Sequence, residues 1–190
     1  MITEQQKQKN YQLFLKKLNE VGVETSKLDE KYGEKILNAT YCTSTDRGPC
    51  YDGSLVETIL RTLTPYAVLI NSKVLKEDKR VDQNTLVKIC LLHQIGKAIS
   101  IIPNDVQWEI EKRGMLYKYD ANQPSIRTGL LSLSMLQDSG ILLDSKEMEA
   151  LTIMDRDATD DQAKYYCSTL SEIIRQANVW TSRELTVEKN

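Results

Sequence analysis

The stretch Cys90-Leu91-Leu92-His93-Gln94-Ile95-Gly96-Lys97 decides the fold, and it contains the only histidine of the 190-residue chain. It ends a predicted helix that begins at Asp82 or Asn84. Apolar residues occupy several sides of this helix, which is typical of a helix at the centre of a bundle. We expect Gly96 to end it. The stretch therefore places a His-Gln pair at the end of a buried helix.

Helical spacing of apolar residues predicts further helices on both sides of this stretch. They are expected at about residues 3–21, 26–41, 54–74 with a kink or break at Pro65, 124–139 with Pro124 in the first turn, 145–153 and 162–182. Residues 108–119 favour a short helix followed by an extended segment, and residues 155–161 an acidic, solvated loop. We therefore predict an all-α bundle of about seven to eight helices.

The composition changes between Cys42 and Gly53, where Thr, Ser, Asp, Gly and Pro are frequent. These residues are typical of loops. We take this loop as the boundary between residues 1–50, an N-terminal helical extension, and residues 51–190, the main helical domain. The length is that of one ordinary domain with an extension.

Charge and cysteine usage narrow the classes of function. A net charge of −2 gives no electrostatic reason to expect nucleic-acid binding. The four cysteines form no Cys-x-x-Cys pair, which favours free thiols in a reducing compartment. No apolar run approaches the roughly 18 residues of a membrane-spanning helix, and the N-terminus lacks the apolar segment of a signal peptide. We expect a cytoplasmic protein without a membrane partner.

The opening stretch resembles L-L-H-D-I-G-K, the central motif of the HD-domain metal-dependent phosphohydrolases, with Gln94 in place of the aspartate. By helix order the resemblance covers about residues 51–183, and it implies an HD-like bundle there. In that family an earlier histidine and a later aspartate complete a metal site. Thr58 falls in the place of the earlier histidine, and Asn178 in the place of the later aspartate.

Three of the four ligands that the resemblance implies are therefore replaced by neutral side chains. A hydroxyl is a poor ligand for transition metals, and one imidazole cannot hold a catalytic divalent ion, because such sites use about three protein ligands. We expect no metal, no cofactor and no catalytic residue. The prediction is a remnant pocket in which Thr58, His93, Gln94 and Asn178 hydrogen-bond one another.

Two other roles for these residues remain open. Lys97, Arg61 and Arg127 could gather near the pocket and bind a phosphate group, although scattered cations are usually solvated. His93 alone could act as a general base, because its ordinary pKa lies near neutrality. A single histidine in an apolar helix is more often a core residue with satisfied hydrogen bonds.

The leading functional hypothesis is a catalytically inactive HD-like protein that binds a partner protein, a second copy of itself or a phosphorylated small molecule. Residues 91–119 are similar to HD-like proteins of tailed bacteriophages, which implies a virion or accessory component in the host cytoplasm. The alternative is a divergent metal-dependent phosphohydrolase acting on a nucleotide or cyclic nucleotide. Its site would have to be rebuilt from Glu57, Asp52 or Asp155.

Overall fold

Helices make up most of the protein in the computed structural model, which describes residues 2–155 and 167–186. The all-α prediction of about seven to eight helices is confirmed. Strands in the described ranges form one small two-stranded sheet. Most of the predicted acidic loop and the predicted start of the last helix, at residues 162–166, lie outside the described residues.

The N-terminal helices α1 (Glu4–Glu20) and α2 (Ser26–Asn38) pack against each other and against the rest of the bundle. The side chain of Thr3 accepts a hydrogen bond from the backbone N–H of Gln6 and so caps α1. The apolar face of this pair belongs to the same hydrophobic core as the later helices, with Phe14, Leu18, Leu28 and Ile36 fully buried. The boundary at residue 50 stays a prediction.

One continuous helical run follows, in the order α3 (Ser54–Thr58), a π-helical turn (Ile59–Leu63), α4 (Thr64–Leu69) and a second π-helical turn (Ile70–Val74). The first wide turn comes immediately before the Thr64-Pro65 pair, where the N–H of Thr64 donates to the carbonyl of Ile59. Proline has no N–H to donate to the carbonyl four residues earlier, so the chain widens here instead of breaking.

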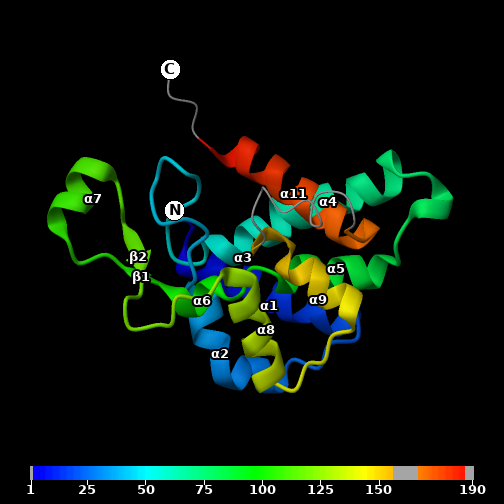
Figure 1. The fold of residues 1–190 in the computed structure, drawn as a ribbon. Coiled ribbons are helices and arrows are strands. Elements are labelled where there is room, and N and C mark those ends of the chain that lie inside the picture. The colour runs from blue at the N-terminus through cyan, green and yellow to red at the C-terminus, as the bar shows by residue number, and fades with distance from the viewer. Residues whose placement is uncertain (1, 156–166, 187–190) are drawn as a thin grey trace.

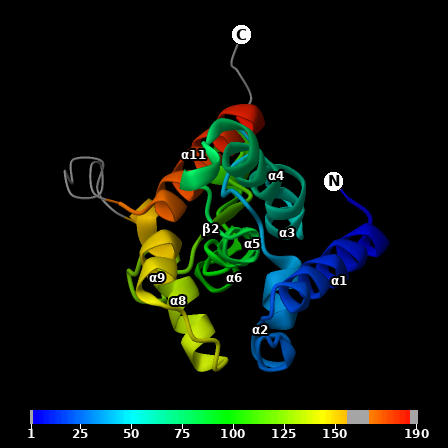
Figure 2. The same ribbon diagram turned by 90° about the vertical axis from the view of Figure 1, so that its right-hand side faces the viewer.

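Helix α5 (Gln83–Leu92) lies at the centre of the bundle, surrounded by α1, α3, α4, α8, α9 and α11 (Figure 2). A short 3-10 turn (Glu77–Lys79) precedes it. The carboxylate of Asp82 caps it by accepting from the N–H of Thr85 at 2.8 Å. Its buried side chains are Leu86, Ile89, Cys90, Leu91 and Leu92. A turn over residues 93–96 then leads into α6 (Lys97–Ser100).

An arm projects from the bundle after α6 (Figure 1). It consists of β1 (Ile101–Pro103), α7 (Gln107–Arg113) and β2 (Tyr117–Tyr119). The strands pair antiparallel, with residue 101 opposite residue 119. The predicted short helix followed by an extended segment is confirmed. Residues 101–103 form a strand because the extended segment supplies a hydrogen-bonding partner.

The remaining helices complete the wall around α5 (Figure 2). They are α8 (Thr128–Asp138), α9 (Ser145–Thr152), a 3-10 turn (Ile153–Asp155) and α11 (Thr169–Leu185), which packs on α9 and α4. Pro124 lies four residues before α8, so its predicted place in the first helical turn is wrong. Gly140 follows α8 with a positive φ, the conformation that favours glycine after a helix end.

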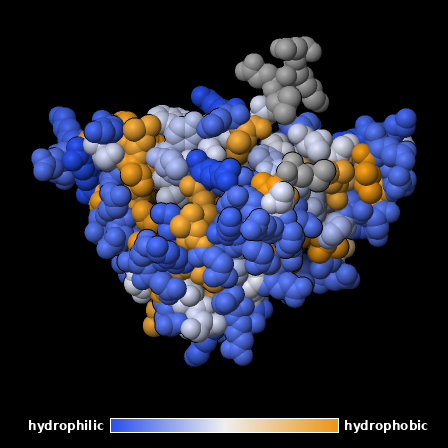
Figure 3. Space-filling view, turned by 180° about the vertical axis from the view of Figure 1, so that it is seen from behind, coloured by the Kyte–Doolittle hydropathy of each residue, from blue (hydrophilic) through white to orange (hydrophobic). Residues whose placement is uncertain are grey.

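Large apolar side chains are exposed at separate places on the surface. On the face in Figure 3, apolar areas are interrupted by hydrophilic side chains. Exposed examples include Leu69, Val74, Val106, Trp108, Tyr119, Leu130 and Leu142. Within the described ranges, no helix combines the length and apolar character needed to cross a bilayer.

Candidate functional site

The turn that follows α5 is held against α8 by a serine and a glycine. The hydroxyl of Ser132 accepts from the N–H of Gly96 at 2.8 Å and donates to the carbonyl of His93 at 3.0 Å. A Cβ atom on Gly96 would lie 2.8 Å from the backbone nitrogen of Ser132 and would collide with the carbonyl of Thr128. Gly96 has φ −56° and does not end a helix as predicted; its missing side chain lets α8 approach.

Three neutral side chains, two from the turn after α5 and one from α11, form a hydrogen-bonded group, which we call the inner cluster: His93, Gln94 and Asn178. The carbonyl of Cys90 accepts from Nδ1 of His93 at 3.1 Å, so Nε2 is free to accept from the amide of Asn178 at 2.9 Å. The same amide nitrogen donates to the carbonyl of Ile174 at 2.8 Å. The amide of Gln94 donates to Oδ1 of Asn178. Each member thus fixes its neighbour's orientation.

Burial keeps the inner cluster uncharged. His93 is 2% exposed, and removal from water lowers the pKa of its imidazole to about 4. At neutral pH the ring therefore has an accepting nitrogen, but the Asn178 amide already occupies that nitrogen. Neutral side chains suit this place because an unpaired buried charge would be costly. The imidazole of His93 therefore has no free lone pair with which to act as a general base.

Lys97 is the cation beside the inner cluster. Its Nζ donates to the carbonyl of Tyr41 at 2.8 Å and lies 3.9 Å from the centre of the Tyr41 ring. Burial lowers the pKa of the ammonium to about 8. An ammonium has three N–H donors, and in the described part of the chain no carboxylate lies within ion-pair distance of this one. Lys97 can therefore bind an anion.

A cavity of about 220 Å³ opens between these residues, and we call it the inner cavity. Gln94, 8% exposed, belongs to its wall, and its Oε1 has no hydrogen-bond partner among the described residues. Asp155 also lines the cavity, and its carboxylate accepts from the N–H groups of Gly129 and Leu130 at the start of α8. The wall is formed by Tyr41, His93, Gln94, Lys97, Thr128, Gly129, Leu151, Met154, Asp155, Asn178 and Ser182.

The structure brings only part of the predicted pocket together. His93, Gln94, Asn178 and Lys97 share the inner cavity, whereas Thr58 is buried at the end of α3 and is not among the described lining residues. Arg61 is also away from the cavity. Its guanidinium is mostly exposed and pairs with Glu57 at 3.0 Å, one helical turn away.

The structure also differs from the predicted pocket at Arg127, Tyr41 and Ser182. Arg127 lines a neighbouring groove, and only the next residue, Thr128, reaches the inner cavity. Tyr41 and Ser182 line the inner cavity but were not predicted. Their sequence gives no signal for a site, because Tyr41 lies after α2 and Ser182 in α11, far apart along the chain. Only tertiary packing places them around Lys97.

The donors around the cavity do not fit the divalent metal site that the resemblance implies. Within residues 2–155 and 167–186, no three His, Cys, Asp and Glu side chains are grouped as metal ligands would be. Glu57 is bound to Arg61 and the Tyr51 hydroxyl, and Asp52 to the Tyr117 hydroxyl. Of the three carboxylates that could rebuild a site, Asp155 alone lines the inner cavity, and α8 already holds its oxygens.

Comparisons with known proteins identify no family for this chain. No protein-family model, no curated protein and no solved structure matches the chain. The likeness to the HD domain therefore rests on the motif and the helix order alone.

Proposed function

We propose that this protein is an HD-like domain that acts by binding and not by metal-dependent hydrolysis. The inner cluster supports the proposal, because neutral side chains bond to one another where a cation and its carboxylates would lie. Lys97 supports binding, because its free N–H donors face a small cavity. The expected ligand group is an anion such as a phosphate, held at Lys97 in the inner cavity.

Metal uptake tests the first half of this proposal. After expression with added manganese, iron, nickel and zinc, we expect the purified chain to contain well under one ion per molecule. A stoichiometric ion bound at His93 would instead support the alternative, a divergent phosphohydrolase acting on nucleotides. Assays of phosphate-ester hydrolysis with each metal should then also show turnover.

A designed variant tests the HD relationship itself. Gln94→Asp/Asn178→Asp restores both carboxylates of the motif beside His93, so it should gain manganese affinity that the natural chain lacks. The variant Gln12→Asp/Gln137→Asp adds the same charge at two exposed positions and should gain none. A folded inner variant that binds no manganese would contradict the HD-like arrangement.

The proposal also includes a protein partner, either a second copy of this chain or a component of a bacteriophage particle. The similarity of residues 91–119 to phage proteins supports the particle. Light scattering should report a mass above that of one chain if copies associate. Mass spectrometry of purified particles from the native host should detect the chain, and its absence would remove this part of the proposal.

A further inference from the structure

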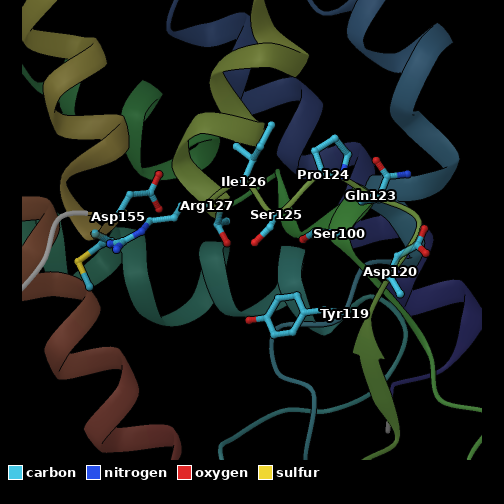
Figure 4. Close-up of a pocket in the computed structure, with 12 residues that line it drawn as sticks. Ser100, Tyr119, Asp120, Gln123, Pro124, Ser125, Ile126, Arg127 and Asp155 are labelled. Carbon is cyan, nitrogen blue, oxygen red and sulfur yellow. The ribbon is translucent and has the colours of Figure 1, made fainter.

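A second, larger cavity lies directly outside the inner cavity, and we call it the outer groove. Its volume is about 770 Å³, and Thr128, Met154 and Asp155 line both cavities. Figure 4 shows its walls, with Tyr119 of β2 on one side and the segment before α8 on the other. The two cavities are therefore adjacent, separated only by these shared residues.

Two buried polar atoms beside the cavities lack a hydrogen-bond partner among the described residues. They are Oγ of Ser100, a residue in the wall of the outer groove, and Oε1 of Gln94, a residue in the wall of the inner cavity. Each residue is only 8% exposed, so water compensates poorly for the missing bond. Oε1 can only accept a hydrogen bond, whereas Oγ can accept or donate. A ligand with hydroxyl groups would satisfy both atoms.

The charges around the two cavities favour an anion. The carboxylate of Asp155 is held by the start of α8, and that of Asp120 accepts from the N–H of Asn122 at 2.9 Å. In the described part of the chain, Lys97 and Arg127 have no carboxylate within ion-pair distance. Each cavity therefore has beside it one cation without an ion-pair partner among the described residues.

Helix α6 contributes one residue to each cavity. Lys97 and Ser100 are three residues apart in this helix, so their side chains start on one face with Cβ atoms about 5–6 Å apart. Lys97 lines the inner cavity and Ser100 the outer groove, so a ligand must extend from one cavity into the other to contact both.

We infer that the inner cavity and the outer groove form one site for a small hydroxylated anion, with its carboxylate or phosphate at Lys97 and a hydroxyl group at Ser100. Gln94 accepts a hydrogen bond from a second ligand hydroxyl, and Arg127 lies at the outer end. This inference rests on the proposed binding function and adds the class of ligand.

Isothermal titration calorimetry with two pairs of probes tests the inference. Acetate and gluconate carry a carboxylate without and with hydroxyl groups, and inorganic phosphate and ribose 5-phosphate make the same comparison for phosphate. We expect the hydroxylated member of at least one pair to bind about tenfold more tightly or better, since it reaches the unpartnered atoms. The pair that shows the gain identifies the anionic group.

Substitutions test which residues cause the tighter binding of the hydroxylated probes. Ser100→Ala should remove the gain and leave affinity for the bare anion unchanged, whereas Lys97→Met should weaken both members of the pair. Ser134→Ala, at an exposed serine of α8, is the matched control and should change neither.

Equal affinity within both pairs, or a gain that survives Ser100→Ala, would overturn the inference. Absence of any anion binding would overturn both this inference and the proposed anion site at Lys97, whereas loss of the hydroxyl gain alone would leave that anion site standing. Stoichiometric metal in the natural protein would instead overturn the proposed function, so the two failures are distinguishable.

Discussion

The inner cluster and the outer groove are adjacent, but their side chains differ in burial and in hydrogen bonding. In the inner cluster, His93, Gln94 and Asn178 use one another as hydrogen-bond partners and are at least nine-tenths buried. In the outer groove, Tyr119 and Arg127 are exposed to solvent. The difference teaches that hydrogen bonds within the inner cluster fix its buried side chains, while the solvent-exposed side chains lie beside it in the outer groove.

The largest effect should come from pushing α8 away from the turn that follows α5. Gly96→Ala places a Cβ against backbone atoms of α8, which cannot move without shifting the helix. We expect the free energy of unfolding to fall by about 3 kcal/mol, as overpacking a tight contact does. Chemical denaturation measures the change.

Gly33→Ala is the control for this substitution. Its Cβ would meet mainly the ends of the Asp29 and Tyr11 side chains, which can move. We expect a change below about 1 kcal/mol. Similar losses for the two alanines would show that Gly96 has no special role in the approach of α8.

Removing the link within the inner cluster should have the next largest effect. Asn178→Ala leaves the Gln94 amide and Nε2 of His93 without partners in a buried place. The expected loss of unfolding free energy is about 2–3 kcal/mol, the cost of unsatisfied buried polar groups. Gln176→Ala removes a half-buried amide two residues away and should cost under about 1 kcal/mol. Equal costs would mean that the inner cluster does not stabilise the fold.

Acid should weaken the inner cluster. Burial lowers the pKa of His93 from 6.5 to about 4, so between these values the unfolded chain binds more protons than the folded one. This stability is fully present above pH 6.5 and is lost as the pH falls towards 4. From pH 7 to pH 5 the loss is about 2 kcal/mol.

Denaturation at several pH values measures this loss. The variant His93→Asn has no imidazole to titrate, so its unfolding free energy should depend less steeply on pH between pH 7 and pH 5. An unchanged slope would show that His93 does not titrate with a lowered pKa.

The smallest effect is expected at Arg61, which the motif suggested but the structure places outside both regions. Arg61→Ala removes an exposed pair with Glu57 and should change the unfolding free energy by no more than about 0.5 kcal/mol. Its affinity for the tighter-binding hydroxylated probe should match that of the natural chain. If Arg61→Ala lost affinity for that probe, as Lys97→Met is expected to, Arg61 would belong to the site.

Helices with strong apolar periodicity were the ones that the sequence predicted best. The helix before His93 and the N-terminal helix α1 were predicted because apolar spacing and local residue preference act within a few turns of chain. The strand β1 and the role of Gly96 were not predicted. Both depend on a partner that is distant along the chain: β2 for the strand and α8 for the glycine.

The sequence by itself determined the helical class and the neutral identity of the motif residues, because both follow from which side chains are present. Only the tertiary structure decided which of them meet. His93 and Asn178 are 85 residues apart and hydrogen-bond, while Thr58 and Arg61 do not line the cavity. The physical reason is that helix packing sets long-range neighbours, and a few degrees of helix rotation decide whether a side chain faces a cavity, the core or solvent.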